Sequence, residues 1–173
     1  NGSNTTTLSG SIKTEGRSAR GIVNNGTNNV TTITKTGTIK TTLNGSTGIR
    51  QTYGEETLTE NILTVEGSIS TKGKNARGIS NEANGNKTTV SGSISTEGEI
   101  AYGIYNFGDS NTTTISAGTL DGSNITTSGT GAHGIYNLGD NNITILAPGG
   151  GITTTGVNTG GIFQAGDNNT AGV

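Results

Sequence analysis

The chain repeats one pattern of apolar and polar positions six times. In its clearest form, between Ile94 and Asn106, the pattern places an isoleucine, a threonine, a glycine, a small residue, a Gly-Ile pair and an amide at fixed spacing. The Gly-Ile pairs begin at Gly21, Gly48, Gly78, Gly103, Gly134 and Gly161. These anchor glycines are 25 to 31 residues apart, which is the spacing of a solenoid or another repeat array.

Each repeat predicts three short β-strands. The first is Ile-x-Thr, the second runs through the Gly-Ile pair to the amide, and the third is rich in threonine. Alternate residues of a strand point to opposite faces, which gives each third strand one inward apolar residue. These inward residues are predicted to be Leu8, Ile33, Val65, Val90, Ile115 and Ile145. Glycines mark the corners, longer loops are expected at 53–61 and 119–123, and no helical period is present.

The predicted fold is therefore all-β: a parallel β-helix with about six three-strand rungs of 25–31 residues, in one domain that covers 1–173. Right-handed winding is expected, because parallel crossovers almost always have this hand. The composition agrees, since 31 glycines, 27% hydrophobic residues and 3% aromatic residues leave little for a compact core. A solenoid needs only a thin core, because each repeat buries its apolar face against its neighbours.

Two rows of amides are predicted to form structural hydrogen-bond ladders along the stack, because a buried amide needs partners and the next rung supplies them. The first row follows each anchor glycine by three residues: Asn24, Gln51, Asn81, Asn106, Asn137 and Gln164. The second row precedes each inward apolar residue of the third strand by four: Asn4, Asn29, Asn61, Asn86, Asn111 and Asn141.

An exposed aromatic strip is the strongest candidate for a binding surface. Tyr105, Tyr136 and Phe163 occupy one outward column on successive rungs, and Phe107 and Leu138 lie two residues further along their strands. Exposed apolar patches of this kind mark interaction surfaces, and aromatic rings also stack on sugars. The alternative is that an aromatic ladder only stabilises the stacking of the rungs.

Two other surface features have weaker functional readings. An outward rank of threonines suggests ice binding, but the column beside it is irregular; the rank is Thr7, Thr32, Thr64, Thr89, Thr114 and Thr144. Asp109, Asp140 and Asp167 occupy equivalent turns and are weak candidates for binding Ca²⁺. The calcium-repeat motif Gly-Gly-x-Gly-x-Asp is absent, and Asp-Asn turns are common without metal.

Nothing in the sequence favours catalysis, a cofactor, nucleic acid or a membrane span. The single histidine, His133, occupies a variable column, and no pair of acids recurs at one site. Cysteine is absent, net charge is −2, and no apolar run reaches 18 residues. All ten Lys and Arg lie within 1–100, so one end of the rod is mildly basic and the other acidic.

The pattern Ile-x-Thr-x-Gly-x-x-Ala-x-Gly-Ile-Tyr-Asn-x-Gly-Asp-x-Asn resembles the passenger repeats of bacterial autotransporter and haemagglutinin-like adhesins. The resemblance covers essentially the whole chain and is clearest at Ile69–Ile79, Ile94–Asn111 and Ile125–Asn141. It implies a right-handed β-helix, export to the bacterial surface, and adhesion or self-association.

We therefore expect a structural or adhesive extracellular protein without enzymatic activity. The sequence begins and ends in a third strand without a capping element, which favours head-to-tail contact with other copies in a filament, or a longer adhesin stalk. The alternative is a module that binds carbohydrate or a surface through the aromatic strip.

Overall fold

The computed structural model describes residues 3–52, 60–117 and 124–173, and these residues form a β-solenoid of 19 strands. The described part of the chain contains no helix, and so no helix that could cross a membrane. The two longer loops expected at 53–61 and 119–123 lie mostly outside the described residues.

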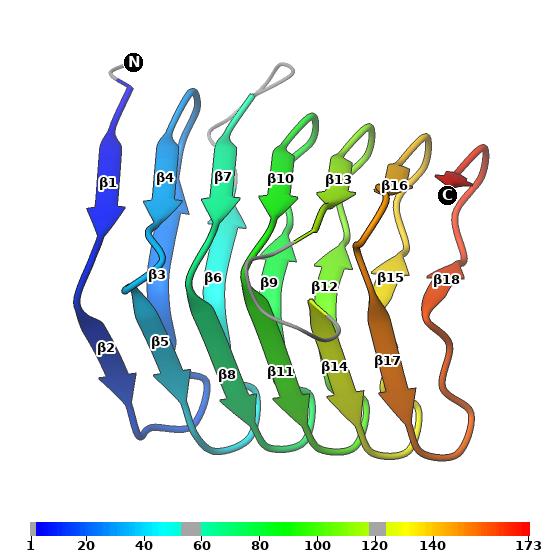
Figure 1. Cartoon of the computed structure of the whole chain (residues 1–173), viewed down its shortest axis with the longest axis horizontal. Coiled ribbons are helices and arrows are strands. Elements are labelled where there is room, and N and C mark those ends of the chain that lie inside the picture. Colours follow the sequence, from blue (N-terminus) through cyan, green and yellow to red (C-terminus); the bar gives the residue numbers. More distant parts are fainter. Residues whose placement is uncertain (1–2, 53–59, 118–123) are drawn as a thin grey trace.

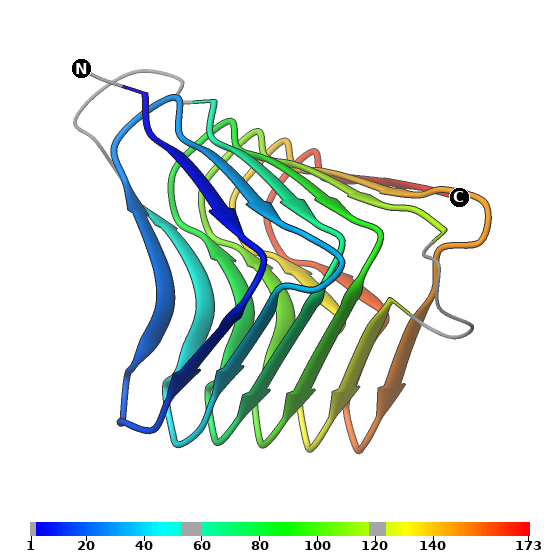
Figure 2. The same ribbon diagram turned by 60° about the vertical axis from the view of Figure 1, so that its left-hand side comes forward.

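Three parallel sheets run along the solenoid and form three sides of a prism (Figures 1 and 2). Sheet A has seven strands: β1 (Thr5–Leu8), β4 (Val30–Ile33), β7 (Ile62–Val65), β10 (Lys87–Val90), β13 (Thr112–Ile115), β16 (Ile143–Leu146) and β19 (Thr170–Gly172). Sheet B has six: β2 (Ser11–Thr14), β5 (Thr38–Thr41), β8 (Ser68–Lys72), β11 (Ser93–Glu97), β14 (Ile125–Ser128) and β17 (Ile152–Thr155). Sheet C also has six: β3 (Arg20–Asn25), β6 (Thr47–Thr52), β9 (Arg77–Asn81), β12 (Tyr102–Asn106), β15 (Ile135–Asn137) and β18 (Ile162–Gln164).

The predicted all-β parallel β-helix with three strands per rung is confirmed. After β1, each rung contributes one strand to sheet B, one to sheet C and one to sheet A in turn. The chain passes down sheets A and B in front, returns up sheet C behind, and advances from left to right, which is a right-handed winding (Figure 1).

Isoleucine columns form the core, because the register pairs each inward residue with its equivalent in the next rung. In sheet B, for example, Ile39 pairs with Ile69, and Ile94 pairs with Ile125. These side chains are at most 1% exposed. Each fully buried isoleucine contributes roughly 1.5–3 kcal/mol, so a thin core of such columns stabilises the stack.

The anchor glycines are required by close packing between rungs. A Cβ built on Gly103 would lie 2.5 Å from Cγ2 of Ile125 and 2.5 Å from the carbonyl oxygen of Gly134. The anchor glycines of the other rungs from Gly21 to Gly134 show the same two contacts, with their own neighbours at 2.3–2.7 Å. The isoleucine of one rung therefore fills the space that glycine leaves in the rung before it.

The first amide row forms a ladder in the middle of the stack. Gln51 donates to Asn81, Asn81 donates to Asn106, and Asn106 donates to Asn137, each with a nitrogen–oxygen distance of 2.7 Å. The asparagines also donate to an inward threonine seven residues later; Asn106, for example, donates to Thr113 at 3.2 Å. At one end Asn24 is buried and donates to its own threonine, and at the other Gln164 is exposed.

The second amide row follows the prediction up to Asn111 and then differs by one residue. Asn4, Asn29, Asn61 and Asn86 each donate to the next asparagine at 2.9–3.0 Å. The residue after Asn111 in the ladder is Asn142, whose Oδ1 accepts the Asn111 backbone N–H at 2.9 Å. The prediction of Asn141 was wrong.

The whole third strand of that rung is shifted by one residue relative to the prediction. Asn141 is exposed with φ 56°, matching Ser110 (φ 57°) one rung earlier. As a result Leu146 pairs with the inward Ile115, whereas Ile145 is 42% exposed rather than inward. Thr144, expected outward, is fully buried and accepts from Asn137. Asparagine tolerates the left-handed backbone, so it can occupy the turn position without glycine.

Candidate functional site: the outer face of sheet C

The outer face of sheet C changes character along the solenoid. Its central outward column is in register over six rungs and consists of Val23, Arg50, Ser80, Tyr105, Tyr136 and Phe163. A second column beside it contains Arg20, Thr47, Arg77 and Tyr102 and continues at His133. Apart from Val23, the first three rungs of this face carry charged or polar residues in these two columns, and the last three rungs carry aromatic residues.

The aromatic rings stack face to face along the solenoid. Ring centroids are 4.9 Å apart between Tyr102 and Tyr136, and 5.1 Å apart between Tyr136 and Phe163, with planes within 9° of parallel. Tyr105 stacks on Tyr102 at 5.6 Å and on Tyr136 at 5.7 Å. Because the rings cover one another, most of their faces are not free for a sugar. Stacking of this kind stabilises the contact between rungs.

The predicted exposure of the aromatic strip is only partly right. Phe107, Leu138 and Phe163 are 47%, 36% and 43% exposed, and Tyr136 is half-buried. Tyr105, predicted to be exposed, is only 8% exposed. The guanidinium of Arg77 lies 4.0 Å above its ring centroid and covers it.

Tyr102 and His133 also belong to the aromatic cluster, although sequence analysis assigned their column no role. His133 stacks on Phe163 at 4.6 Å, and its Nδ1 accepts the Gly160 backbone N–H at 3.0 Å. Burial lowers the pKa of His133, so the neutral ring that this hydrogen bond requires is favoured. Burial also raises the pKa of Tyr102 and of Tyr105, so both phenols are neutral near pH 7. The sequence contains one signal for this assignment, because Tyr102 and His133 are both aromatic and occupy the same column in successive repeats.

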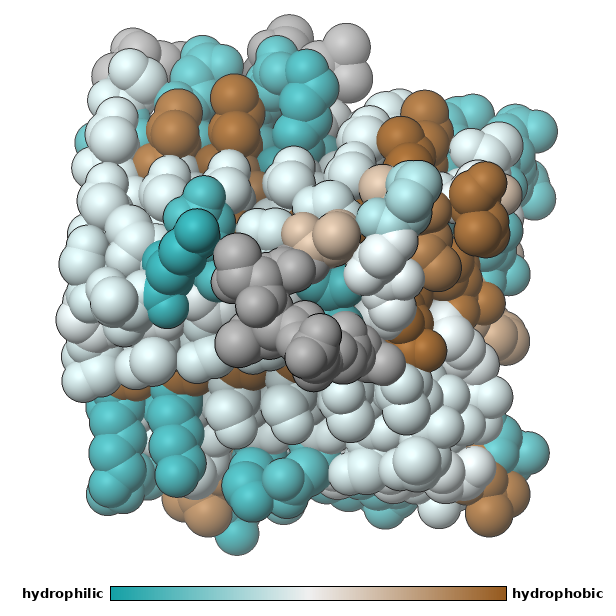
Figure 3. Space-filling view, in the orientation of Figure 1, coloured by the Kyte–Doolittle hydropathy of each residue, from teal (hydrophilic) through white to brown (hydrophobic). Residues whose placement is uncertain are grey.

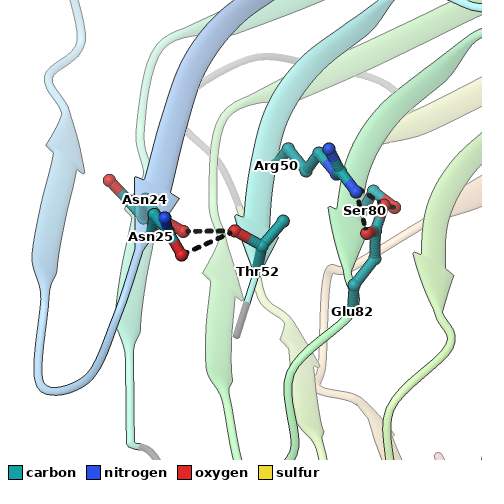
Figure 4. A network of polar contacts seen from close by, with 6 residues as sticks. All are labelled: Asn24, Asn25, Arg50, Thr52, Ser80 and Glu82. Atoms are coloured by element: carbon teal, nitrogen blue, oxygen red, sulfur yellow. Dashed lines mark hydrogen bonds and ion pairs between the residues drawn. The ribbon is translucent and has the colours of Figure 1, made fainter. Parts of the chain in front are cut away.

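A polar network adjoins the stack on the side of the earlier rungs (Figure 4). The Arg50 guanidinium binds the Glu82 carboxylate through two atoms, with Nε to Oε1 at 2.8 Å, and Ser80 donates to Oε1 at 3.1 Å. Burial would raise the pKa of Glu82, but its hydrogen bonds and the charge of Arg50 outweigh that effect and lower it. The Arg50 and Glu82 side chains are 30% and 18% exposed, less than those of the other ion pairs among the described residues.

A small open pocket lies where the polar and aromatic parts meet. It has a volume of about 210 Å³ and is lined by Arg77, Glu82, Tyr105 and Phe107. Arg77 and Tyr105 come from β9 and β12, while Glu82 and Phe107 directly follow the ladder amides at the ends of these strands. The ladder and the pairing of the two strands therefore hold all four side chains at fixed positions.

Two of the three aspartates considered for Ca²⁺ accept backbone hydrogen bonds from the next rung. Oδ1 of Asp109 accepts the backbone N–H of Asp140 at 2.8 Å, and Oδ1 of Asp140 accepts that of Asp167 at 2.7 Å. The carboxylates thus cap the turns of successive rungs. No group of three or more His, Cys, Asp or Glu side chains within 3–52, 60–117 and 124–173 is arranged to hold a metal ion.

The outer face of sheet A carries the threonine rank considered for ice binding. Thr7, Thr32, Thr64, Thr89 and Thr114 are in register, but the next position is Ile145 and not Thr144. The column beside it is irregular, with Thr5, Val30, Ile62, Lys87, Thr112 and Ile143. Figure 3 shows a largely pale face, interrupted by apolar residues over β4, β7 and β16. We therefore do not propose ice binding.

Comparison of the chain with protein-family models, curated proteins and solved structures finds no match.

Proposed function

We propose that the solenoid is a structural element of an extracellular bacterial surface fibre or adhesin. The observation that carries this proposal is the unbroken register of all three sheets over the described rungs, reinforced by the two amide ladders. Every rung is joined to the next by backbone and side-chain hydrogen bonds at once. A rod built in this way is suited to a structural role along its axis.

The same periodicity supports axial continuation. A further rung would repeat the contacts that already join neighbouring rungs, whether it belongs to another copy or to the same chain. The charge distribution favours contact between copies, since the mildly basic half of one would meet the acidic half of the next. Head-to-tail contacts that do not close into a ring give filaments.

Electron microscopy of the purified chain at increasing concentration tests self-assembly. Filaments with a subunit repeat of ~29 Å, that is six rungs at the strand spacing of ~4.8 Å, are expected if copies join end to end. Discrete particles would instead assign the chain to a longer stalk. In a second assay, the chain displayed on a non-adherent bacterium should cause clumping or adhesion. Discrete particles together with no gain in clumping or adhesion would overturn the proposal.

Carbohydrate binding is the second candidate function, and the pocket on sheet C favours it. Aromatic rings beside charged side chains in a hollow of this size are suited to a single sugar ring. The stacked strip itself is a poorer candidate, because its ring faces are occupied by other rings.

A further inference from the structure

The pocket on sheet C has one more positive than negative charge when Arg50 is counted together with the lining residues Arg77 and Glu82. Glu82 is held by Arg50 through two contacts, which neutralises that pair. The Arg77 guanidinium forms no ion pair with any described residue, and its Nε is buried without a hydrogen-bond partner there. The pocket therefore presents a net positive charge, which favours an anionic group in the ligand.

Arg77 is already oriented to bind such a group. Its guanidinium lies over the Tyr105 ring at 4.0 Å, and a guanidinium in this position can still donate N–H groups at its edge to a ligand. Two N–H groups of the planar guanidinium can donate in parallel to the two oxygens of a carboxylate. Because the side chain is held before the ligand arrives, less conformational entropy is lost on binding.

Phe107 supplies the apolar wall of the pocket. Its ring is 47% exposed and makes only a tilted contact with Tyr105, at 6.1 Å and 33°. Much of the Phe107 ring is therefore open to solvent, beside the pocket that it lines. The flat C–H face of a pyranose can lie against such a ring while its hydroxyls reach the polar wall at Glu82.

We propose that this pocket binds a carboxylate-bearing pyranose, such as a uronic acid residue of a polysaccharide or a sialic acid residue of a glycan. The proposal rests on the second candidate function and names its ligand class. Arg77 binds the carboxylate, Phe107 packs against the ring, and Glu82 accepts a hydroxyl. The volume of about 210 Å³ limits the site to one sugar residue, so the rest of the glycan lies outside it.

Calorimetric titration with two acidic probes tests the ligand class. The probes are trigalacturonate and 3′-sialyllactose, and their neutral counterparts are the methyl esters of these two compounds. The proposal is supported if either acidic probe binds and its neutral counterpart binds more weakly. The acidic probe that binds more tightly then shows whether the ligand is a uronic acid or a sialic acid residue. Equal binding of acidic and neutral probes, or no binding of either acid at millimolar concentration, overturns it.

Matched variants test the location. Arg77→Gln should weaken binding by about tenfold or more, because a charge-assisted hydrogen bond is lost. Arg20→Gln, in the same column two rungs away, should leave binding within about twofold, since a surface charge at that distance is screened. Phe107→Leu should weaken binding, whereas Phe163→Leu should not. Far-UV circular dichroism melting curves confirm that each variant folds.

Two results would refute this location. One is unchanged binding by the folded Arg77→Gln variant, and the other is a loss with Phe163→Leu but not with Phe107→Leu, which would place the glycan on the aromatic stack. The microscopy of the unmodified chain does not depend on this site. The structural proposal and the glycan proposal therefore fail on different measurements.

Discussion

Replacing one asparagine in the middle of the first amide ladder tests whether the ladders hold the solenoid together. Asn106 is fully buried, and three hydrogen bonds depend on its side chain. It accepts from Asn81, and it donates to Asn137 and to Thr113. Leucine has the same branched skeleton as asparagine with methyl groups in place of the amide atoms, so Asn106→Leu removes these bonds without opening a cavity.

The expected loss follows from these contacts. Each of the three partner groups that the substitution leaves buried and unpaired costs about 1–3 kcal/mol. The added apolar contact of leucine offsets only a part, so Asn106→Leu should reduce the free energy of unfolding by about 3 kcal/mol or more. Urea unfolding followed by circular dichroism measures this change.

Gln164→Leu is the matched control, because it lies in the same column but is exposed. It should change the free energy of unfolding by less than about 0.5 kcal/mol, as surface substitutions usually do. The double variant Asn81→Leu, Asn106→Leu should cost less than the sum of the single variants, since their shared bond is lost only once. A loss for Asn106→Leu no larger than that of the control, or strict additivity, would refute the ladder argument.

Three further predictions follow from individual contacts. Gly103→Ala should lower the melting temperature strongly, because the new Cβ would overlap Ile125 and Gly134. Gly10→Ala is the control, because no atom lies within 4 Å of its Cβ, and similar melting temperatures for the two variants would contradict the packing argument. The pKa of Glu82 is lowered on folding, so its contribution is present above the unfolded value of about 4.3 and lost as the pH falls through the folded value. The stability difference between the unmodified chain and Glu82→Gln in urea unfolding should therefore shrink from pH 7 to pH 3, and a constant difference would refute this. Burial lowers the pKa of His133, so the unfolded chain binds its proton more readily and the free energy of unfolding should rise as the pH increases through about 6.5. His133→Phe should remove this part of the pH dependence, and an unchanged pH profile of stability would contradict the assignment to His133.

The fold could be predicted from the sequence because inward positions obey strict rules. Each inward side chain contacts its equivalent in the next rung, so size and polarity must repeat along the column. Gly103 shows this most clearly, since no other residue fits beside Ile125. The repeating spacing therefore identified the strands, the core and most of both amide ladders.

The misplaced ladder residue shows where such rules fail. In the third strand of its rung, Ile143, Ile145 and Leu146 are all apolar, so alternation alone allows two phases. The Gly-Asp turn settles the phase: counting from Asp109 and from Asp140 places Asn111 and Asn142 at the same position. The turn fixes the register because Asp109 accepts the backbone N–H of Asp140.

The candidate site was less predictable, because outward side chains need not repeat. Tyr105 is covered by Arg77, which lies in a different column and in the rung before it, so no rule based on one column predicts the contact. The pocket also depends on Arg50, since that residue neutralises Glu82. Four unlike residues from neighbouring rungs define the site, and only their three-dimensional register brings them together.

This difference between inward and outward positions explains where function can reside in the molecule. Inward columns are fixed by packing, so any specific chemistry must use outward positions, where one rung can differ from the next. On sheet C the outward residues change abruptly between β9 and β12, from Arg77 and Ser80 to Tyr102 and Tyr105. A uniform rod needs no such change, whereas a binding pocket requires unlike side chains on adjacent rungs. The pocket lies at this boundary, as expected if it is the ligand site that we propose.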